Sequence, residues 1–248
     1  QRYGTSEQVL GNAFNSLGIS DSVNVITKFD PKLDHLNVES LSLALDKSLQ
    51  RLGVSSLYGI FLHREELLNL WDKGLAEVLN SFVISGKVKH IGVSVYSPEK
   101  AVQALNTDGV DMVQLPTNIL DRRFETAGVF RLAEEKRKKI YIRSIFLQGL
   151  LLMDIKEIPE KMLFAKPVIE KLESLCQDVG LLRQEIALGY LKAEMKNTKI
   201  VFGADSPQHV KENMACWKRG LSPSLISRIK DLFNNIGEKI LNPALWPN

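Results

Sequence analysis

The sequence lacks the features that mark secreted, membrane-spanning or nucleic-acid-binding proteins. Its 248 residues include only two cysteines, Cys176 and Cys216, at no metal-ligand spacing, so we expect two buried thiols and no metal site. No apolar run approaches the roughly 20 residues that span a bilayer, and no signal-peptide pattern is present, although a targeting segment could precede Gln1. The net charge of +3 is too small to indicate a polyanionic partner. We therefore expect a cytoplasmic protein that acts on a small molecule and binds neither nucleic acid nor membrane, and we leave its oligomeric state open.

Short apolar runs alternate with amphipathic stretches along the whole chain. The runs are nearly continuous, as is typical of parallel strands covered on both faces, and they lie at Val23–Lys28, Leu57–His63, His90–Ser94, Met112–Leu115, Ile140–Ser144 and Lys199–Gly203. Apolar residues three or four apart predict helices over Val38–Leu52, Leu67–Ser85, Pro98–Asn106, Glu125–Lys138, Pro167–Val179, Arg183–Met195, Pro207–Lys218 and Pro223–Ile240. Two of these helices begin with a serine cap followed by proline, at Ser97 and Ser206. The alternation predicts an α/β fold with a parallel sheet and right-handed crossovers.

The kind of α/β fold follows from what comes after the strands. No Gly-x-Gly-x-x-Gly follows any of them, which argues against a Rossmann domain. The more economical interpretation is a (β/α)8 TIM barrel in a single domain over residues 1–248, with an extra helix and tail over residues 222–248. Two strands of that barrel would precede Gln1. Because six strands leave two sheet edges exposed, we expect a chain that begins at Gln1 to aggregate or stay inactive.

The predicted strands end on polar or small residues. In barrels of this kind the reacting groups lie at the carboxyl ends of the strands, and those ends carry Lys28, His63, Ser94, Gln114, Arg143 with Ser144, and Gly203. Each has a structural explanation when taken singly, as a residue at the barrel rim or, for the serines, as a helix cap. All six strand ends together point to a site. The Asp121-Arg122-Arg123 segment, after the fourth strand, is expected to form a salt bridge within its loop.

Four separated segments of the sequence carry a resemblance to a known family. They are Tyr3–Gly11 (YGTSEQVLG), Gly86–Ser94 (GKVKHIGVS), Gln148–Leu151 (QGLL) and Phe202–Asn213. In order and spacing they resemble the motifs of the aldo-keto reductases, over nearly the whole chain. The resemblance implies a (β/α)8 barrel that binds NAD(P)H without a Rossmann fold and transfers a hydride to an aldehyde or ketone.

The same resemblance implies a catalytic group of Tyr3, Lys28 and His63, with an aspartate that would precede Gln1. The chemistry is consistent with these residue types. A free tyrosine is a poor proton donor at neutral pH, but the Lys28 ammonium would stabilise the phenolate and lower the pKa of Tyr3. His63 could donate a hydrogen bond to the carbonyl oxygen and share its developing charge.

The resemblance also implies a set of cofactor-binding residues. It assigns Ser94 and Gln114 to the nicotinamide carboxamide, and it puts Arg143 where relatives often have a stacking tyrosine. A guanidinium plane can stack as well, while Val95 replaces the usual asparagine. The remaining contacts would be Ser144 and Gln148 to the pyrophosphate, Gly203, Ser206 and His209 around the adenosine, and Glu212 and Asn213 to adenine. The last loop also carries Lys211, and NADP(H) is favoured over NAD(H).

Two other functions remain open at this point. The first is a cofactor-binding barrel with a regulatory or redox-sensing role and no significant turnover. The second is a lyase or isomerase that works through a Schiff base on Lys28.

Overall fold

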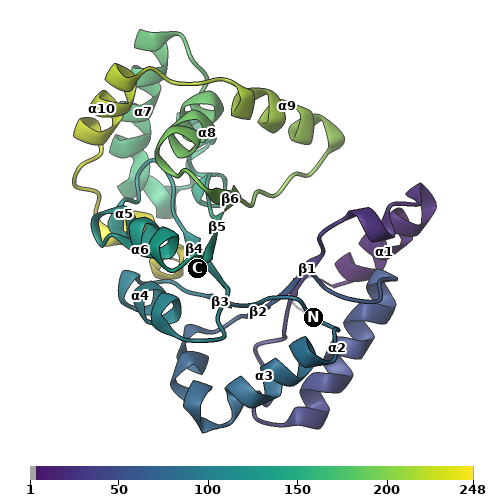
Figure 1. Cartoon of the computed structure of the whole chain (residues 1–248). Helices are drawn as coiled ribbons and strands as arrows, with labels where there is room; N and C mark the ends of the chain where they lie inside the picture. The colour runs from purple at the N-terminus through teal and green to yellow at the C-terminus, as the bar shows by residue number, and fades with distance from the viewer. Residues whose placement is uncertain (1–3, 248) are drawn as a thin grey trace. The chain divides into compact units, whose positions relative to one another are not determined.

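The computed structural model describes residues 4–247 and divides the chain into two compact units. The first unit comprises the residues up to 115 together with 131–140, and the second comprises 116–130 and the residues from 141 onward. Six strands form one sheet, in sequence order along it (Figure 1). The strands are β1 (Ile26–Lys28), β2 (Gly59–Leu62), β3 (Ile91–Ser94), β4 (Met112–Pro116), β5 (Lys139–Arg143) and β6 (Thr198–Ile200). All six predicted strands are confirmed, although β6 ends three residues before Gly203.

The first four strands pair in parallel, as the sequence predicts. Lys28 of β1 is opposite Phe61 of β2, which is opposite Gly92 of β3, and Ser94 of β3 is opposite Gln114 of β4. Every residue of β2 and β3 is buried. This burial explains why these strands are continuous apolar runs rather than alternating ones.

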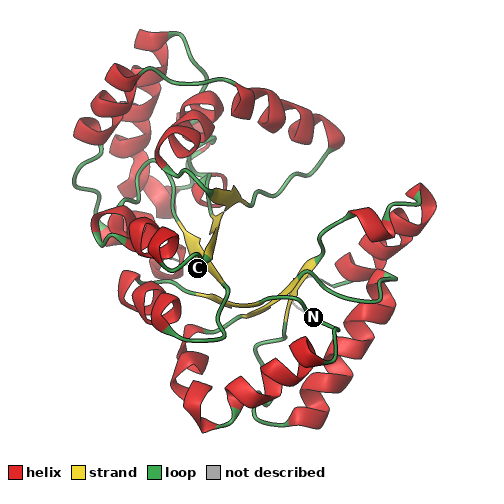
Figure 2. Ribbon diagram, in the orientation of Figure 1, coloured by secondary structure: helices red, strands yellow, loops and turns green. Residues whose placement is uncertain are grey.

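Helices follow the strands along the chain, as Figure 2 shows. They are α1 (Ser6–Leu17), α2 (Val38–Leu52), α3 (Leu75–Ile84), α4 (Pro98–Asn106), α5 (Arg123–Thr126), α6 (Val129–Glu135), α7 (Lys166–Val179), α8 (Arg183–Glu194), α9 (Pro207–Lys218), α10 (Pro223–Leu232) and α11 (Glu238–Leu241). The bounds of α2, α4 and α9 are the predicted ones. Ser97 caps α4 and Ser206 caps α9. Their hydroxyl oxygens accept hydrogen bonds from the backbone N–H groups of Lys100 and His209, respectively, each at 3.2 Å.

Three predicted helices are broken in the structure. The stretch from Leu67 to Ser85 is a 3₁₀ helix (Glu65–Lys73) followed by α3, and Gly74 separates them with a φ of 104°. Gly128, with a φ of 70°, lies between α5 and α6. The helix predicted to continue to Ile240 ends at Leu232 and is followed by the short α11. At the two glycines the left-handed backbone ends the helix although the apolar spacing continues.

Two residues of the Tyr3–Gly11 segment have structural roles in helix α1. The buried Glu7 carboxylate accepts hydrogen bonds from Thr27 Oγ1 at 2.7 Å and from Arg51 Nε at 2.8 Å, so it ties α1 to β1 and α2. Gly11 allows the close approach of α1 and α2, because a Cβ built there would lie 2.2 Å from the backbone oxygen of Arg51. These residues therefore hold the strand that ends in Lys28.

Polar residues also cluster at the opposite, amino-terminal ends of the strands in the first unit. Lys139 Nζ donates to Tyr58 Oη at 2.7 Å and lies 2.9 Å from His90 Nε2, while His90 Nδ1 lies 3.4 Å from an Asp111 oxygen. An ammonium group can only donate, so Nε2 must be an unprotonated acceptor and the imidazole must be neutral. Burial, and then the Lys139 charge, hold the pKa of His90 below its ordinary value.

This cluster predicts a loss of stability in mild acid. Because the pKa of His90 is lower in the folded chain than its ordinary value of 6.5, the unfolded chain binds more protons as the pH falls through that value, and the free energy of unfolding decreases. We expect Tm to fall between about pH 6.5 and pH 5. His90→Gln keeps an acceptor for Lys139 without a titrating group, so its Tm should vary less over that range. A slope equal to that of the wild type would contradict this assignment. Buried His35, whose pKa burial also lowers, contributes to the slope that remains.

The second unit is held in part by charged residues. Asp121, which is 1% exposed, accepts two hydrogen bonds from the Arg123 guanidinium at 2.9 and 2.8 Å, which confirms the loop salt bridge. Lys230 lies 3.2 Å from Glu125 and also pairs with Glu194.

Cys176 and Cys216 are free and buried, as predicted, and burial raises the pKa of Cys176 to about 11. Among residues 4–247 no helix has the length and apolar content to cross a membrane. Over the same residues, no group of three or more His, Cys, Asp or Glu side chains is arranged to hold a metal ion.

Candidate active site

Four predicted site residues lie at or near the carboxyl ends of the strands of the first unit. Lys28 ends β1, His63 directly follows β2, and Ser94 ends β3. Gln114 lies within β4, opposite Ser94. Parallel strands bring these four residues to one end of the sheet, as the sequence predicts. The predicted Tyr3 lies outside the described residues.

Two of these side chains are in direct contact. Lys28 Nζ donates a hydrogen bond to Gln114 Oε1, although the two residues are 86 positions apart in the sequence. Lys28 Nζ also lies 5.8 Å from the centre of the Phe61 ring, a distance typical of a cation–π contact. Lys28 is half-buried and Gln114 is buried, so the charge is partly shielded from solvent.

Ser94 does not cap a helix, which rules out its structural explanation. Ser97 caps α4 instead. Ser94 is 0% exposed, and within residues 4–247 its Oγ has no hydrogen-bond partner. A buried hydroxyl without a hydrogen-bond partner costs free energy, which makes Ser94 a candidate for contact with a ligand or an ordered water.

Val95 is buried, and its backbone N–H donates to the Gln114 carbonyl oxygen at 2.8 Å. Its side chain has no polar atom to offer a cofactor.

The segment after β5 belongs to the second unit and has an unusual backbone. Ser144, Leu147 and Gln148 have φ angles of 59°, 48° and 53°, in the left-handed region that residues other than glycine rarely adopt. Such strain gathers at ligand-binding turns. Arg143 Nη1 donates to Ser144 Oγ at 3.3 Å, and the buried Asn118 donates to the Ser144 carbonyl oxygen at 3.3 Å. Sequence reasoning missed Asn118, because no motif marks it.

The last predicted loop also lies in the second unit. Gly203 and His209 are exposed, and Ser206 caps α9. Glu212 accepts a hydrogen bond from Gln208 at 2.9 Å. Asn213 is 4% exposed and accepts one from Gln184 at 2.6 Å, so it also joins α9 to α8. The cofactor contacts of these residues stay predictions.

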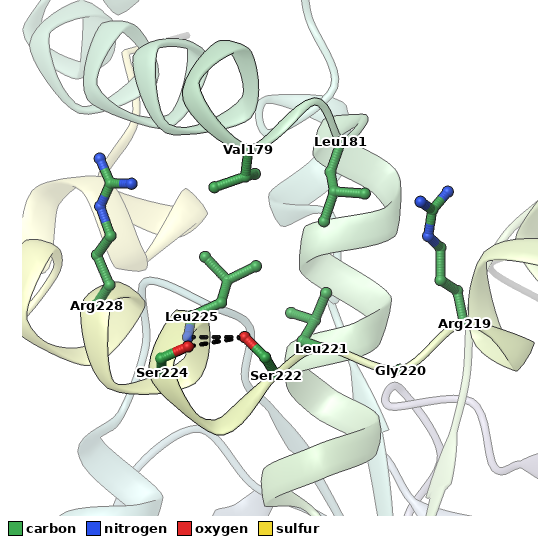
Figure 3. Close-up of a pocket in the computed structure, with 9 residues that line it drawn as sticks. All are labelled: Val179, Leu181, Arg219, Gly220, Leu221, Ser222, Ser224, Leu225 and Arg228. Atoms are coloured by element: carbon green, nitrogen blue, oxygen red, sulfur yellow. Dashed lines mark hydrogen bonds between the residues drawn. The ribbon is translucent and has the colours of Figure 1, made fainter.

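One cavity of the second unit lies away from these residues. It has a volume of about 440 Å³ and is lined by Val179, Leu181, Arg219, Gly220, Leu221, Ser222, Ser224, Leu225 and Arg228 (Figure 3). Its two arginines are already paired, Arg219 with Glu185 and Arg228 with Asp178, each at 2.6 Å. None of the predicted site residues that the structure describes lines it. We therefore do not assign the chemistry to this cavity.

The strand order and the polar residues at the strand ends define an α/β protein with a candidate site at the carboxyl ends of its parallel strands. The sequence model of the aldo/keto reductase family matches residues 1–234, and the chain belongs to that family.

Known relatives agree with this assignment. The chain is 25% identical over 215 residues to the NADH-specific methylglyoxal reductase of Escherichia coli, in a match that covers 80% of this chain and 65% of the relative. It is 24% identical over 198 residues to an L-glyceraldehyde 3-phosphate reductase of Escherichia coli, in a match that covers 70% of this chain and 57% of the relative. The chain therefore spans less than two thirds of the length of both relatives.

Solved structures have the same fold. An aldo-keto reductase from Bacillus halodurans in its holo form gives a TM-score of 0.73 at 23% identity, over 91% of this chain and 76% of that one. An aldo/keto reductase from Klebsiella pneumoniae in complex with NADP and acetate gives a TM-score of 0.68 at 20% identity. The match covers 92% of this chain and 75% of that one. These likenesses confirm the predicted α/β barrel class.

Proposed function

We propose that this protein catalyses the NAD(P)H-dependent reduction of a small aldehyde or ketone. The observation that carries the proposal is the arrangement of Lys28, Gln114 and the unpartnered Ser94 hydroxyl at the carboxyl end of the sheet. Family membership supports it, as do the carbonyl reductases among the relatives. We also propose that residues 1–248 form one reductase domain, since the family match spans both units.

The residues divide into groups that bind the cofactor and groups that handle the proton. Ser94 and Gln114 would hold the carboxamide and Arg143 would lie against the nicotinamide. Ser144 with Gln148 would bind the pyrophosphate, and the residues from Gly203 to Asn213 would bind the adenosine. When bound, the nicotinamide supplies a hydride. The chain's own task is to aim that group and to exclude water from it.

The proton has to reach the carbonyl oxygen as negative charge builds there. We assign its donation to Tyr3, because an ammonium group beside a phenol stabilises the phenolate and makes the phenol a better acid. Lys28 would supply that ammonium. His63, directly after β2, would donate a hydrogen bond to the same oxygen and orient the substrate.

The cofactor preference is part of the proposal. His209 and Lys211 are exposed in α9, where positive charge could pair with a 2′-phosphate, so we favour NADP(H). The relatives differ on this point, since one is NADH-specific and another structure contains NADP. Titrating the protein with NADPH and NADH at equal ionic strength measures the preference directly.

The test of the proposed function is turnover. The full-length wild-type protein should oxidise NADPH or NADH in the presence of an aldehyde panel, and Tyr3→Phe should lower the rate by about 10²- to 10⁴-fold, the usual contribution of a proton donor. Tight cofactor binding with equal rates for the wild type and Tyr3→Phe would favour a regulatory barrel and reject the proposed reductase activity.

A further inference from the structure

Lys28 reaches Gln114 across two intervening strands. Lys28 ends β1 and Gln114 lies in β4, with β2 and β3 between them in the sheet. Gly92 of β3 leaves room for the Phe61 ring, because a Cβ built at Gly92 would lie 2.4 Å from Cε1 of that ring. The Phe61 ring occupies that space, and the Lys28 ammonium lies over the ring. The contact is therefore built into the packing of the strands.

The ammonium also fixes which way the Gln114 amide faces. A lysine ammonium carries only donors, so the amide atom that it contacts must be the oxygen. Gln114 Oε1 is thus committed to Lys28, and Nε2 carries its two N–H donors at the other end of the amide. Ser94, opposite Gln114 in the register, presents a buried hydroxyl that can accept a hydrogen bond.

We propose that Gln114 is a positioning residue that couples Lys28 to cofactor binding, an inference that rests on the proposed function. The nicotinamide carboxamide has an oxygen that accepts and an NH₂ group that donates. Gln114 Nε2 would donate to that oxygen and Ser94 Oγ would accept from the NH₂ group. One side chain then holds the carboxamide by its nitrogen and Lys28 by its oxygen. Binding of the cofactor fixes the Gln114 rotamer and, through it, the ammonium that tunes the proton donor.

Two substitutions test the oxygen end and the nitrogen end of the Gln114 amide separately. Gln114→Met keeps the length of the side chain and removes both hydrogen-bonding ends. Gln114→Glu keeps an oxygen for Lys28 and removes the N–H donors. The matched control is Gln177→Met, which alters an exposed glutamine that bonds to Glu173 within α7.

The experiment compares the NADPH dissociation constant, from fluorescence titration, with the pH dependence of kcat in all three variants. For Gln114→Met we expect the dissociation constant to rise about 3- to 10-fold, as for loss of a neutral hydrogen bond, and kcat to fall about 10- to 100-fold, as for loss of one to a charged group. Gln114→Glu should weaken NADPH binding to a similar degree with a smaller loss of kcat. The alkaline limb of its kcat–pH profile should move to higher pH. The new carboxylate offsets the Lys28 charge, so the pKa of the proton donor rises. Gln177→Met should match the wild type.

Several results would overturn the coupling. Weaker NADPH binding in both Gln114 variants with an unchanged kcat would leave Gln114 as a carboxamide contact only. A lower kcat in both without any movement of the pH limb would mean a general disturbance of the strand, because loss of packing does not shift a proton-transfer pKa. A full-length wild-type protein that neither binds NADPH nor reduces any carbonyl would instead reject the proposed function.

Discussion

Lys28→Met is expected to lower kcat for carbonyl reduction by about 10²- to 10⁴-fold while the chain stays folded. Methionine has a similar length and still packs over the Phe61 ring, but it has neither the charge nor the donor that Gln114 Oε1 accepts. The proton donor would lose the ammonium that stabilises its anion. The measurement is steady-state NADPH oxidation, with Tm and circular dichroism recorded on the same samples.

The control for this substitution is Lys32→Met. Lys32 is exposed in the loop after β1, and its backbone N–H donates to Asp30 Oδ1 at 2.9 Å, a contact that Lys32→Met keeps. Its variant should retain the wild-type rate. Equal rates for Lys28→Met and Lys32→Met would rule out a role for Lys28. Covalent trapping of a carbonyl compound on Lys28 by borohydride, without NADPH turnover, would instead favour a Schiff-base enzyme.

Much of the fold can be predicted because the signals are local. Continuous apolar runs predict all six strands, and β2 and β3 are buried throughout, as expected of parallel strands covered on both faces. Serine followed by proline predicts the starts of α4 and α9, because the serine side chain satisfies a free backbone N–H. The breaks at Gly74 and Gly128 were missed. A single glycine within a helical pattern is tolerated often enough that its left-handed backbone is visible only in the structure.

The candidate site is only partly predictable, for a different reason. The end of a strand can be located from the sequence, and so Lys28, His63 and Ser94 lie where the pattern indicates. Which side chains touch depends on the register of strands distant in sequence. The contact between Lys28 and Gln114 and the support of Ser144 by Asn118 could not be deduced in that way. The strain after β5 has no sequence signal either, since Leu147 and Gln148 do not favour positive φ.

The packing of α1 on α2 predicts the largest stability effect, in Gly11→Ala. In Figure 1 the two helices lie side by side, and a Cβ at Gly11 would be 2.2 Å from the Arg51 oxygen and 2.8 Å from the Leu52 carbonyl carbon. These are backbone atoms and cannot turn away, so α1 has to shift. Overpacking of this kind costs about 1–3 kcal/mol, and Tm should fall by roughly 2–12 °C.

The shift of α1 should also reach the candidate site. Glu7 on the same helix accepts from Thr27, the residue before Lys28, so displacement of α1 pulls on the end of β1. We therefore expect Gly11→Ala to lower kcat as well as Tm. The matched control is Gly220→Ala, because a Cβ at Gly220 meets no atom within 4 Å and its backbone is not left-handed. Thermal unfolding and NADPH oxidation of both variants test the argument. A Gly11→Ala protein as stable as Gly220→Ala would mean that α1 does not pack on α2 as described, and Glu7 could then not hold the strand that carries Lys28.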